Sequence, residues 1–224
     1  RILKESSFEN LHIPPSPGDA GSAIGAAQYL YHSYHQKPRK LHDITQRIIE
    51  NVYVGPSYTS DEIKHFLNSE NIEYEIFDDD ELIKNCARLI ADGNVVGWYQ
   101  GKMEWGPRAL GNRSILADPR RKEMKDILNE KIKHRESFRP FAPSILEEYT
   151  SEYFDIDIPS PYMLMVAPVK KPDKIPAVTH VDGTGRVQTV SKNSNPLYHK
   201  LISQFYKLTG IPVIINTSMN VKGE

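Results

Sequence analysis

VVGWY at residues 95–99, followed by GKMEWGPRALGNRS at residues 101–114, is the most informative stretch of this sequence. The apolar run, bounded by turn residues, predicts a buried strand. The segment behind it combines Lys102, Arg108 and Arg113 with three glycines and a serine, which predicts a turn-rich loop. Ligands of α/β sheets usually bind just beyond strand ends, and arginine grips phosphate or carboxylate oxygens bidentately. We therefore expect a strand that leads into an anion-binding loop.

Helix and strand patterns alternate on both sides of this stretch. Thr59 and Glu62 form a capping-box pattern, and both Asp118-Pro119 and Asn195-Pro196 resemble an N-cap followed by proline at the first helical position. Apolar periodicity predicts helices over residues 59–67, 80–91, 118–132 and 195–208, and apolar runs predict strands at 73–76, 162–166, 187–190 and 211–215. This order predicts an α/β domain around one twisted sheet.

The first forty residues have a different character. A glycine-rich turn at 18–21 precedes a helix of small residues at 23–30, and residues 36–40 are typical of a linker. We expect two domains, residues 1–40 and 41–224. The first residue is Arg1, and the chain stops shortly after an apolar strand, so we also expect a piece of a longer polypeptide.

Composition narrows the class of protein. The 224 residues include 28 basic and 29 acidic side chains, for a net charge of -1, which does not favour nucleic-acid binding. No apolar run approaches the ~18 residues of a membrane span. The single cysteine, Cys86, cannot form an internal disulfide and lies on the predicted apolar face of a helix. These features predict a cytoplasmic protein that does not associate with membranes.

Besides the loop, which also offers the Ser114 hydroxyl, several segments carry candidate ligand-binding residues. Arg139 lies between aromatic residues and prolines that stiffen its backbone, and Arg186 follows a glycine turn. Asn216, Ser218 and Asn220 follow an apolar strand and would share one face by alternation. For each segment a purely structural role, as a solvated loop, a packed surface arginine or turn chemistry, stays open.

Asp19 is the candidate metal ligand. It lies in the glycine-rich turn at 18–21, where a carboxylate can bind a metal ion or position phosphate-bound magnesium. The alternative is that Asp19 caps the helix that follows.

Together these motifs resemble the nodulation-type O-carbamoyltransferases, which carbamoylate antibiotics and nodulation factors. The resemblance is carried by EWGPRALGNRSILADPR at 104–120, FRPFAP at 138–143, HVDGT at 180–184 and NTSMN at 216–220, in matching order and approximate spacing. It covers essentially the whole chain.

The resemblance implies a two-domain enzyme. Residues 1–40 would be the C-terminal remnant of a Kae1-like, actin-like ATPase domain, whose iron or other divalent metal site is incomplete here, with Asp19 as its acidic ligand. Residues 41–224 would be a YrdC-like domain with a twisted mixed sheet and flanking helices. This domain would make carbamoyl-adenylate from carbamoyl phosphate and ATP, with Mg²⁺.

The resemblance also implies residue roles. Lys102, Arg108 and Arg139 would face the carbamoyl and phosphate groups as catalytic cations. The positions expected to contact the nucleotide are Arg113, Ser114, Arg186, Asn216, Ser218 and Asn220. The missing N-terminal domain would transfer the carbamoyl group to a hydroxyl of a small-molecule acceptor. Two other functions stay open, a threonylcarbamoyl-adenylate synthase-like enzyme and a non-catalytic RNA-binding module, and so does a homodimer.

Overall fold

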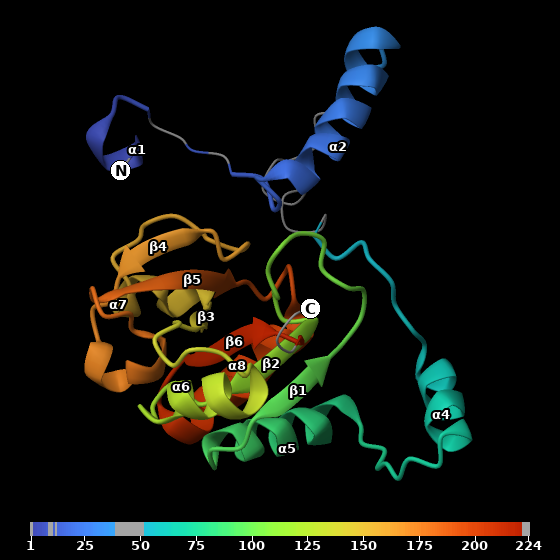
Figure 1. Ribbon diagram of the computed structural model, residues 1–224, viewed down its shortest axis with the longest axis vertical. Coiled ribbons are helices and arrows are strands. Elements are labelled where there is room, and N and C mark those ends of the chain that lie inside the picture. Colours follow the sequence, from blue (N-terminus) through green and yellow to red (C-terminus); the bar gives the residue numbers. More distant parts are fainter. Residues whose placement is uncertain (1, 9–10, 12, 39–51, 221–224) are drawn as a thin grey trace. The chain divides into compact units, whose positions relative to one another are not determined.

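The computed structural model describes residues 2–8, 11, 13–38 and 52–220. It divides the chain into two compact units (Figure 1). Unit 1 comprises Arg1–Val52 and Trp105–Pro107, and unit 2 comprises Tyr53–Glu104 and Arg108–Glu224. The predicted domain boundary after residue 40 lies outside the described residues, so that assignment stays a prediction.

Unit 1 contains helices α1 (Ile2–Glu5) and α2 (Asp19–Tyr29), and α2 continues into a π-helical turn, η1 (Leu30–Tyr34). Helix α2 begins at Asp19, earlier than the predicted residue 23. Its N-cap is Gly18, and no side chain caps the first turn, so Asp19 is the first helical residue and does not serve as the cap.

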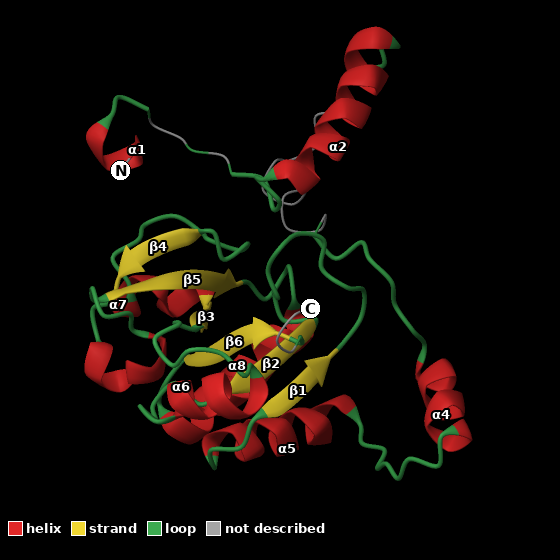
Figure 2. Ribbon diagram, viewed as in Figure 1, coloured by secondary structure: helices red, strands yellow, loops and turns green. Residues whose placement is uncertain are grey.

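Unit 2 is built on one six-stranded mixed sheet in the order β1-β2-β6-β3-β5-β4, which confirms the predicted α/β fold (Figure 2). Only β3 and β5 pair in parallel among the described strands. The strands are β1 (Val96–Tyr99), β2 (Arg113–Ala117), β3 (Ala142–Leu146), β4 (Met165–Pro168), β5 (Thr184–Val190) and β6 (Val213–Ser218). The specific likeness to YrdC stays a prediction.

The helices of unit 2 are α4 (Ser60–Ser69), α5 (Asp79–Ala91), α6 (Met124–Ile127), η2 (Leu128–Ile132), η3 (Glu147–Tyr149), α7 (Thr150–Tyr153), η4 (Pro172–Lys174), η5 (Pro176–Val178) and α8 (Pro196–Thr209). Thr59 forms the predicted capping box with Glu62 at the start of α4. No helix in the described ranges is long and apolar enough to cross a membrane.

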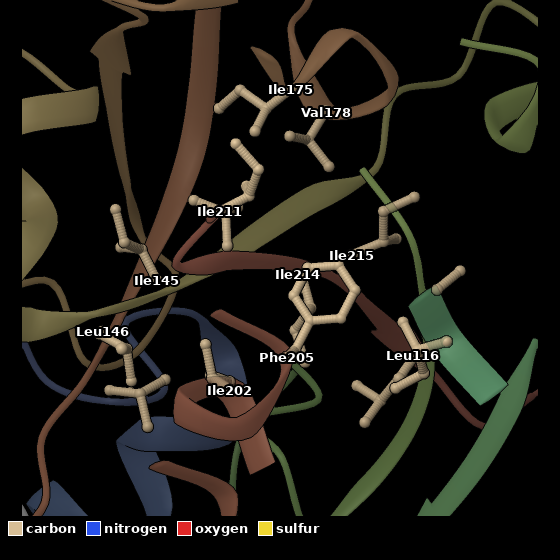
Figure 3. Close-up of a cluster of buried hydrophobic side chains, with 14 of the residues drawn as sticks. Leu116, Ile145, Leu146, Ile175, Val178, Ile202, Phe205, Ile211, Ile214 and Ile215 are labelled. Carbon is tan, nitrogen blue, oxygen red and sulfur yellow. The ribbon is translucent and has the colours of Figure 1, made fainter. Parts of the chain in front are cut away.

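The buried core includes residues of the sheet, of helices α5 and α8, and of α6, η2 and η5. Ile202 and Phe205 of α8 belong to one buried cluster with Ile214 of β6 and Leu116 of β2 (Figure 3). Cys86 of α5 belongs to the same cluster, as its predicted place on an apolar helix face requires. Strand β6, between β2 and β3, buries every residue from Val213 to Asn216, which is the pattern of a strand covered on both faces.

Two sequence predictions are wrong. Residues 73–76 form no strand, and they are exposed. Asp118-Pro119 does not begin a helix, because residues 119–120 form a turn and α6 begins only at Met124. The predicted strand at 162–166 is shifted to β4, and strands β2 and β3 were not predicted.

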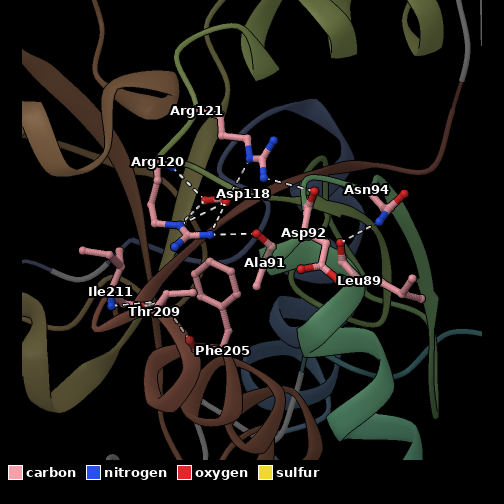
Figure 4. A network of polar contacts seen from close by, with 10 residues as sticks. All are labelled: Leu89, Ala91, Asp92, Asn94, Asp118, Arg120, Arg121, Phe205, Thr209 and Ile211. Atoms are coloured by element: carbon pink, nitrogen blue, oxygen red, sulfur yellow. Dashed lines mark hydrogen bonds and ion pairs between the residues drawn. The ribbon is translucent and has the colours of Figure 1, made fainter.

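Asp118 has a different structural role. Its carboxylate is fully buried and accepts hydrogen bonds from Arg120 Nε at 2.9 Å and Nη2 at 2.6 Å, with Arg121 Nε at 3.6 Å (Figure 4). The same two arginines donate to the carbonyls of Ala91 and Asp92 at the C-terminal end of α5. Cations near a helix C-terminus are favourable, so Asp118 connects β2 to α5 through these arginines.

Candidate functional site

Glu104 fastens the loop that follows β1. Its side chain is buried, and one oxygen, Oε1, accepts the backbone N–H groups of Leu110 at 2.8 Å, Asn112 at 2.7 Å and Arg113 at 3.1 Å. Within the described ranges no cation pairs with this carboxylate, so backbone dipoles alone balance its charge. The residues after Arg108 are thereby wrapped around one buried anion.

The carbonyl side of the same turn is held by other side chains. Asn216 Nδ2 donates to the Ala109 carbonyl at 3.0 Å, and Gln188 Nε2 donates to the Leu110 carbonyl at 2.9 Å. The Tyr53 hydroxyl also donates to the Leu110 carbonyl, at 3.0 Å. Asn216 and Gln188 come from β6 and β5, so the sheet fixes the backbone directly after Arg108.

Arg108 and Arg186 form a pair of neighbouring cations. Burial, followed by the like charges of Arg108 and Arg135, lowers the pKa of Arg186 to about 10. The Nε atoms of Arg108 and Arg186 are both buried and have no hydrogen-bond acceptor. In the described part of the chain neither guanidinium has a carboxylate partner. Because a buried guanidinium N–H normally has an acceptor, this arrangement is suited to receive an anion.

Arg135 and Arg139 continue this cluster of cations. Burial and then Arg139 lower the pKa of Arg135, whereas Glu136 raises it. Arg135 Nε donates to Asn129 Oδ1 at 2.8 Å, and Arg139 pairs with Glu136 at 3.0 Å on the exposed rim. Of the three predicted catalytic cations, Arg108 therefore acts on Arg186, whereas Arg139 acts on Arg135, and among the described residues no contact joins Arg108 to Arg139.

Lys102 is different. It is exposed, and its ammonium makes no hydrogen bond or ion pair with any residue that the structure describes. It also does not contribute to the lowered pKa of Arg186. The structure does not bring Lys102 into contact with Arg108 or Arg139. Its role as the third catalytic cation stays a prediction.

Lys133 was not singled out from the sequence. It is 4% exposed, and its ammonium donates to Ser218 Oγ at 3.3 Å, to the Asn220 carbonyl at 2.8 Å, to Asn220 Oδ1 at 3.0 Å and to the Ser218 carbonyl. Burial and the charge of Arg135 lower its pKa to about 8. The density of basic residues at 131–135 was the only sequence indication of this contact.

The predicted nucleotide ligands other than Arg186, which lies beside Arg108, divide into two sets. Ser218 and Asn220 lie together at the end of β6, where the Ser218 hydroxyl donates to Asn220 Oδ1. Ser114 is buried and its Oγ accepts the Gly111 N–H at 3.1 Å. Arg113 donates to the carbonyls of residues 56, 100, 101 and 112 and stacks on the Tyr99 ring at 3.4 Å.

Asn216 belongs with Ser114 and Arg113. Sequence reasoning placed it beyond the last strand, but β6 extends to Ser218, so Asn216 lies inside the sheet and is buried. These three side chains bind the protein's own backbone, so the structure shows them supporting the loop.

Asp19 is exposed in the first turn of α2. Among the described residues no group of three or more His, Cys, Asp or Glu side chains could hold a metal ion. The residues present therefore do not build a metal centre around Asp19, and its role as a ligand stays a prediction.

Comparison with known proteins identifies the family. Residues 87–224 match the model of the carbamoyltransferase C-terminus. The chain is 44% identical to the uncharacterized protein sll1178 of Synechocystis, 43% to nodulation protein NolNO of Sinorhizobium fredii and 41% to nodulation protein NolO of Bradyrhizobium diazoefficiens.

These matches cover 98–100% of this chain but 32–41% of the three relatives. The chain thus spans about a third to two fifths of their length. With a family model over more than half of its residues and homology along its whole length, the chain belongs to the carbamoyltransferase C-terminus family.

Proposed function

We propose that this chain is the part of an O-carbamoyltransferase that binds carbamoyl phosphate and ATP and forms carbamoyl-adenylate. The observation that carries the proposal is the pair formed by Arg108 and Arg186, with two buried, unpaired Nε atoms and no carboxylate beside them among the described residues. Family membership supplies the chemical class of the reaction.

The electrostatics favour a phosphate-like ligand. In the absence of an anion, the like charges of Arg108, Arg135 and Arg186 oppose one another, and burial adds to the cost. A phosphate with two negative charges offsets this repulsion and gives each guanidinium a bidentate acceptor. Lys133 would extend the same positive region toward Ser218 and Asn220, which suits a second anionic group such as the triphosphate of ATP.

The reaction needs no nucleophilic side chain. Carbamoyl phosphate reacts with water to give carbamate and inorganic phosphate. A carbamate oxygen then attacks the α-phosphorus of ATP, the bond from that phosphorus to the oxygen bridging to the β-phosphate breaks, and pyrophosphate leaves. Negative charge accumulates on phosphate oxygens, and fixed guanidinium groups stabilise it without reorganisation.

Supporting side chains complete the site. In this proposal Arg113, Ser114 and Asn216 hold the loop, whereas Arg108, Arg139, Arg186 and Lys133 face the ligands. Mg²⁺ would arrive bound to the ATP phosphates, as is usual for this ion, and no described carboxylate is assigned to it. The final transfer to a small-molecule hydroxyl belongs to the longer protein, as does any iron or other divalent metal.

Calorimetric titration of carbamoyl phosphate into the wild-type chain, Arg108→Ala and Arg186→Ala tests the binding step. Loss of a charge-assisted contact costs about 1.5–3 kcal/mol, so each arginine variant should bind roughly 10- to 100-fold more weakly. Lys64→Ala is the matched control, because it removes one positive charge from the surface of α4. Equal affinity for all four proteins would refute the proposed site.

The adenylation step has its own test. If the chain forms carbamoyl-adenylate reversibly, labelled pyrophosphate should enter ATP only when carbamate is supplied by carbamoyl phosphate. Exchange driven by threonine and bicarbonate would instead assign the threonylcarbamoyl reaction.

A further inference from the structure

We propose that Glu104 is a positioning residue for Arg108. Its carboxylate fixes the backbone turn that follows Arg108 and so sets the direction from which the guanidinium meets the bound phosphate. This inference rests on the proposed function and assigns a role to a residue that contacts no ligand.

The first support is the geometry of the turn. Three backbone N–H groups, from Leu110, Asn112 and Arg113, converge on Glu104 Oε1 at 2.7–3.1 Å. Hydrogen bonds to an ionised acceptor are shorter and roughly twice as strong as neutral ones. A neutral amide oxygen at this position would accept the same three N–H groups more weakly.

The second support is the freedom of the Arg108 side chain. Its Nε has no hydrogen-bond partner, and within the described residues no ion pair holds its guanidinium. The orientation of the side chain is therefore determined by where the backbone places its Cα and by packing. Because Glu104 holds the amide of Leu110, two residues after Arg108, a change at Glu104 would reach Arg108 through this short stretch of backbone.

The third support is that a second clamp acts on the same turn. The Tyr53 hydroxyl and Gln188 Nε2 both donate to the Leu110 carbonyl. Glu104 holds the amide of Leu110 while Tyr53 and Gln188 hold its carbonyl, so this peptide segment is restrained on both sides. The Tyr53 hydroxyl is thus an independent point at which the same mechanism can be weakened.

A double-mutant cycle separates positioning from general stabilisation. We would measure the Kd for carbamoyl phosphate of the full chain as wild type, Glu104→Gln, Arg108→Ala and the double variant, together with the thermal midpoint of each. The Glu104→Gln substitution keeps an acceptor of the same shape but removes the charge. We expect it to weaken binding about tenfold, and the double variant to bind no more weakly than Arg108→Ala alone.

The outcomes are distinct. If Glu104→Gln leaves the Kd unchanged, or if its effect multiplies with that of Arg108→Ala, the positioning role is wrong. If Arg108→Ala itself has no effect on the Kd, the proposed function fails instead. Should Glu104→Gln not fold, Tyr53→Phe takes its place, because it removes one donor to Leu110 with little change in shape. Tyr53→Phe should weaken the binding of carbamoyl phosphate about threefold, because one neutral hydrogen bond is lost. This effect must likewise disappear in the Arg108→Ala background.

Discussion

Gly111→Ala probes the turn that holds Arg108 in place. Gly111 has φ +104°, and a Cβ at this position would lie 2.3 Å from Cδ1 and 2.6 Å from Cε1 of the buried Tyr198 ring. A positive φ costs an alanine about 1–2 kcal/mol, and forcing an extra carbon into a packed core adds about 1–3 kcal/mol. We therefore expect a loss of roughly 2–5 kcal/mol in the free energy of unfolding.

Gly210→Ala is the matched control for this prediction. Gly210 also has a positive φ, +72°, but a Cβ added there would meet no described atom within 4 Å, so only the backbone strain applies. Urea unfolding followed by the fluorescence of the buried Trp98 would measure both variants. The reasoning is refuted if Gly111→Ala is no more destabilising than Gly210→Ala, since the turn would then not pack on Tyr198.

Three further predictions concern charged side chains. Burial lowers the pKa of Lys133 from 10.5 to about 8. As pH rises, Lys133 therefore loses its proton in the folded protein before it does so in the unfolded chain. The stability of wild type should accordingly rise relative to that of Lys133→Met between about pH 8 and 10.5. A difference between the urea midpoints of the two proteins that stays constant across this pH range would contradict this prediction. The affinity of wild type for ATP should fall as pH rises through about 8, and titrations on either side of that value should show a smaller fall for Lys133→Met. Asp118→Asn should cost about 1.5–3 kcal/mol because it weakens the charge-assisted hydrogen bonds to two partly exposed arginines, while Asp80→Asn, which removes the exposed partner of Lys200, should change the urea midpoint little.

Local sequence patterns predicted elements well where local and tertiary preferences agree. Asn195-Pro196 begins α8 as expected, with the Asn195 side chain accepting the Tyr198 N–H. Asp118-Pro119 has the same pattern, but the Asp118 carboxylate binds Arg120 and Arg121, and no helix begins at this position. The difference depends on α5, a distant segment whose last carbonyls need those arginines.

The candidate site was predictable only in part for the same reason. Arg108, Arg139 and Arg186 were identified from motifs; in the structure Arg108 lowers the pKa of Arg186, and Arg139 lowers the pKa of Arg135. Glu104 and Lys133 were missed because their roles depend on contacts with residues brought close by the fold. No local pattern shows that an acidic side chain will collect three amides, or that a lysine will meet Ser218 and Asn220 across 85 and 87 positions.

A crystal structure of the chain with carbamoyl phosphate would test the central claim most directly. We predict that the phosphate group lies between Arg108 and Arg186 and accepts a hydrogen bond from the Nε of each. A phosphate bound away from this pair, or two guanidinium groups that point to different ligands, would contradict the account.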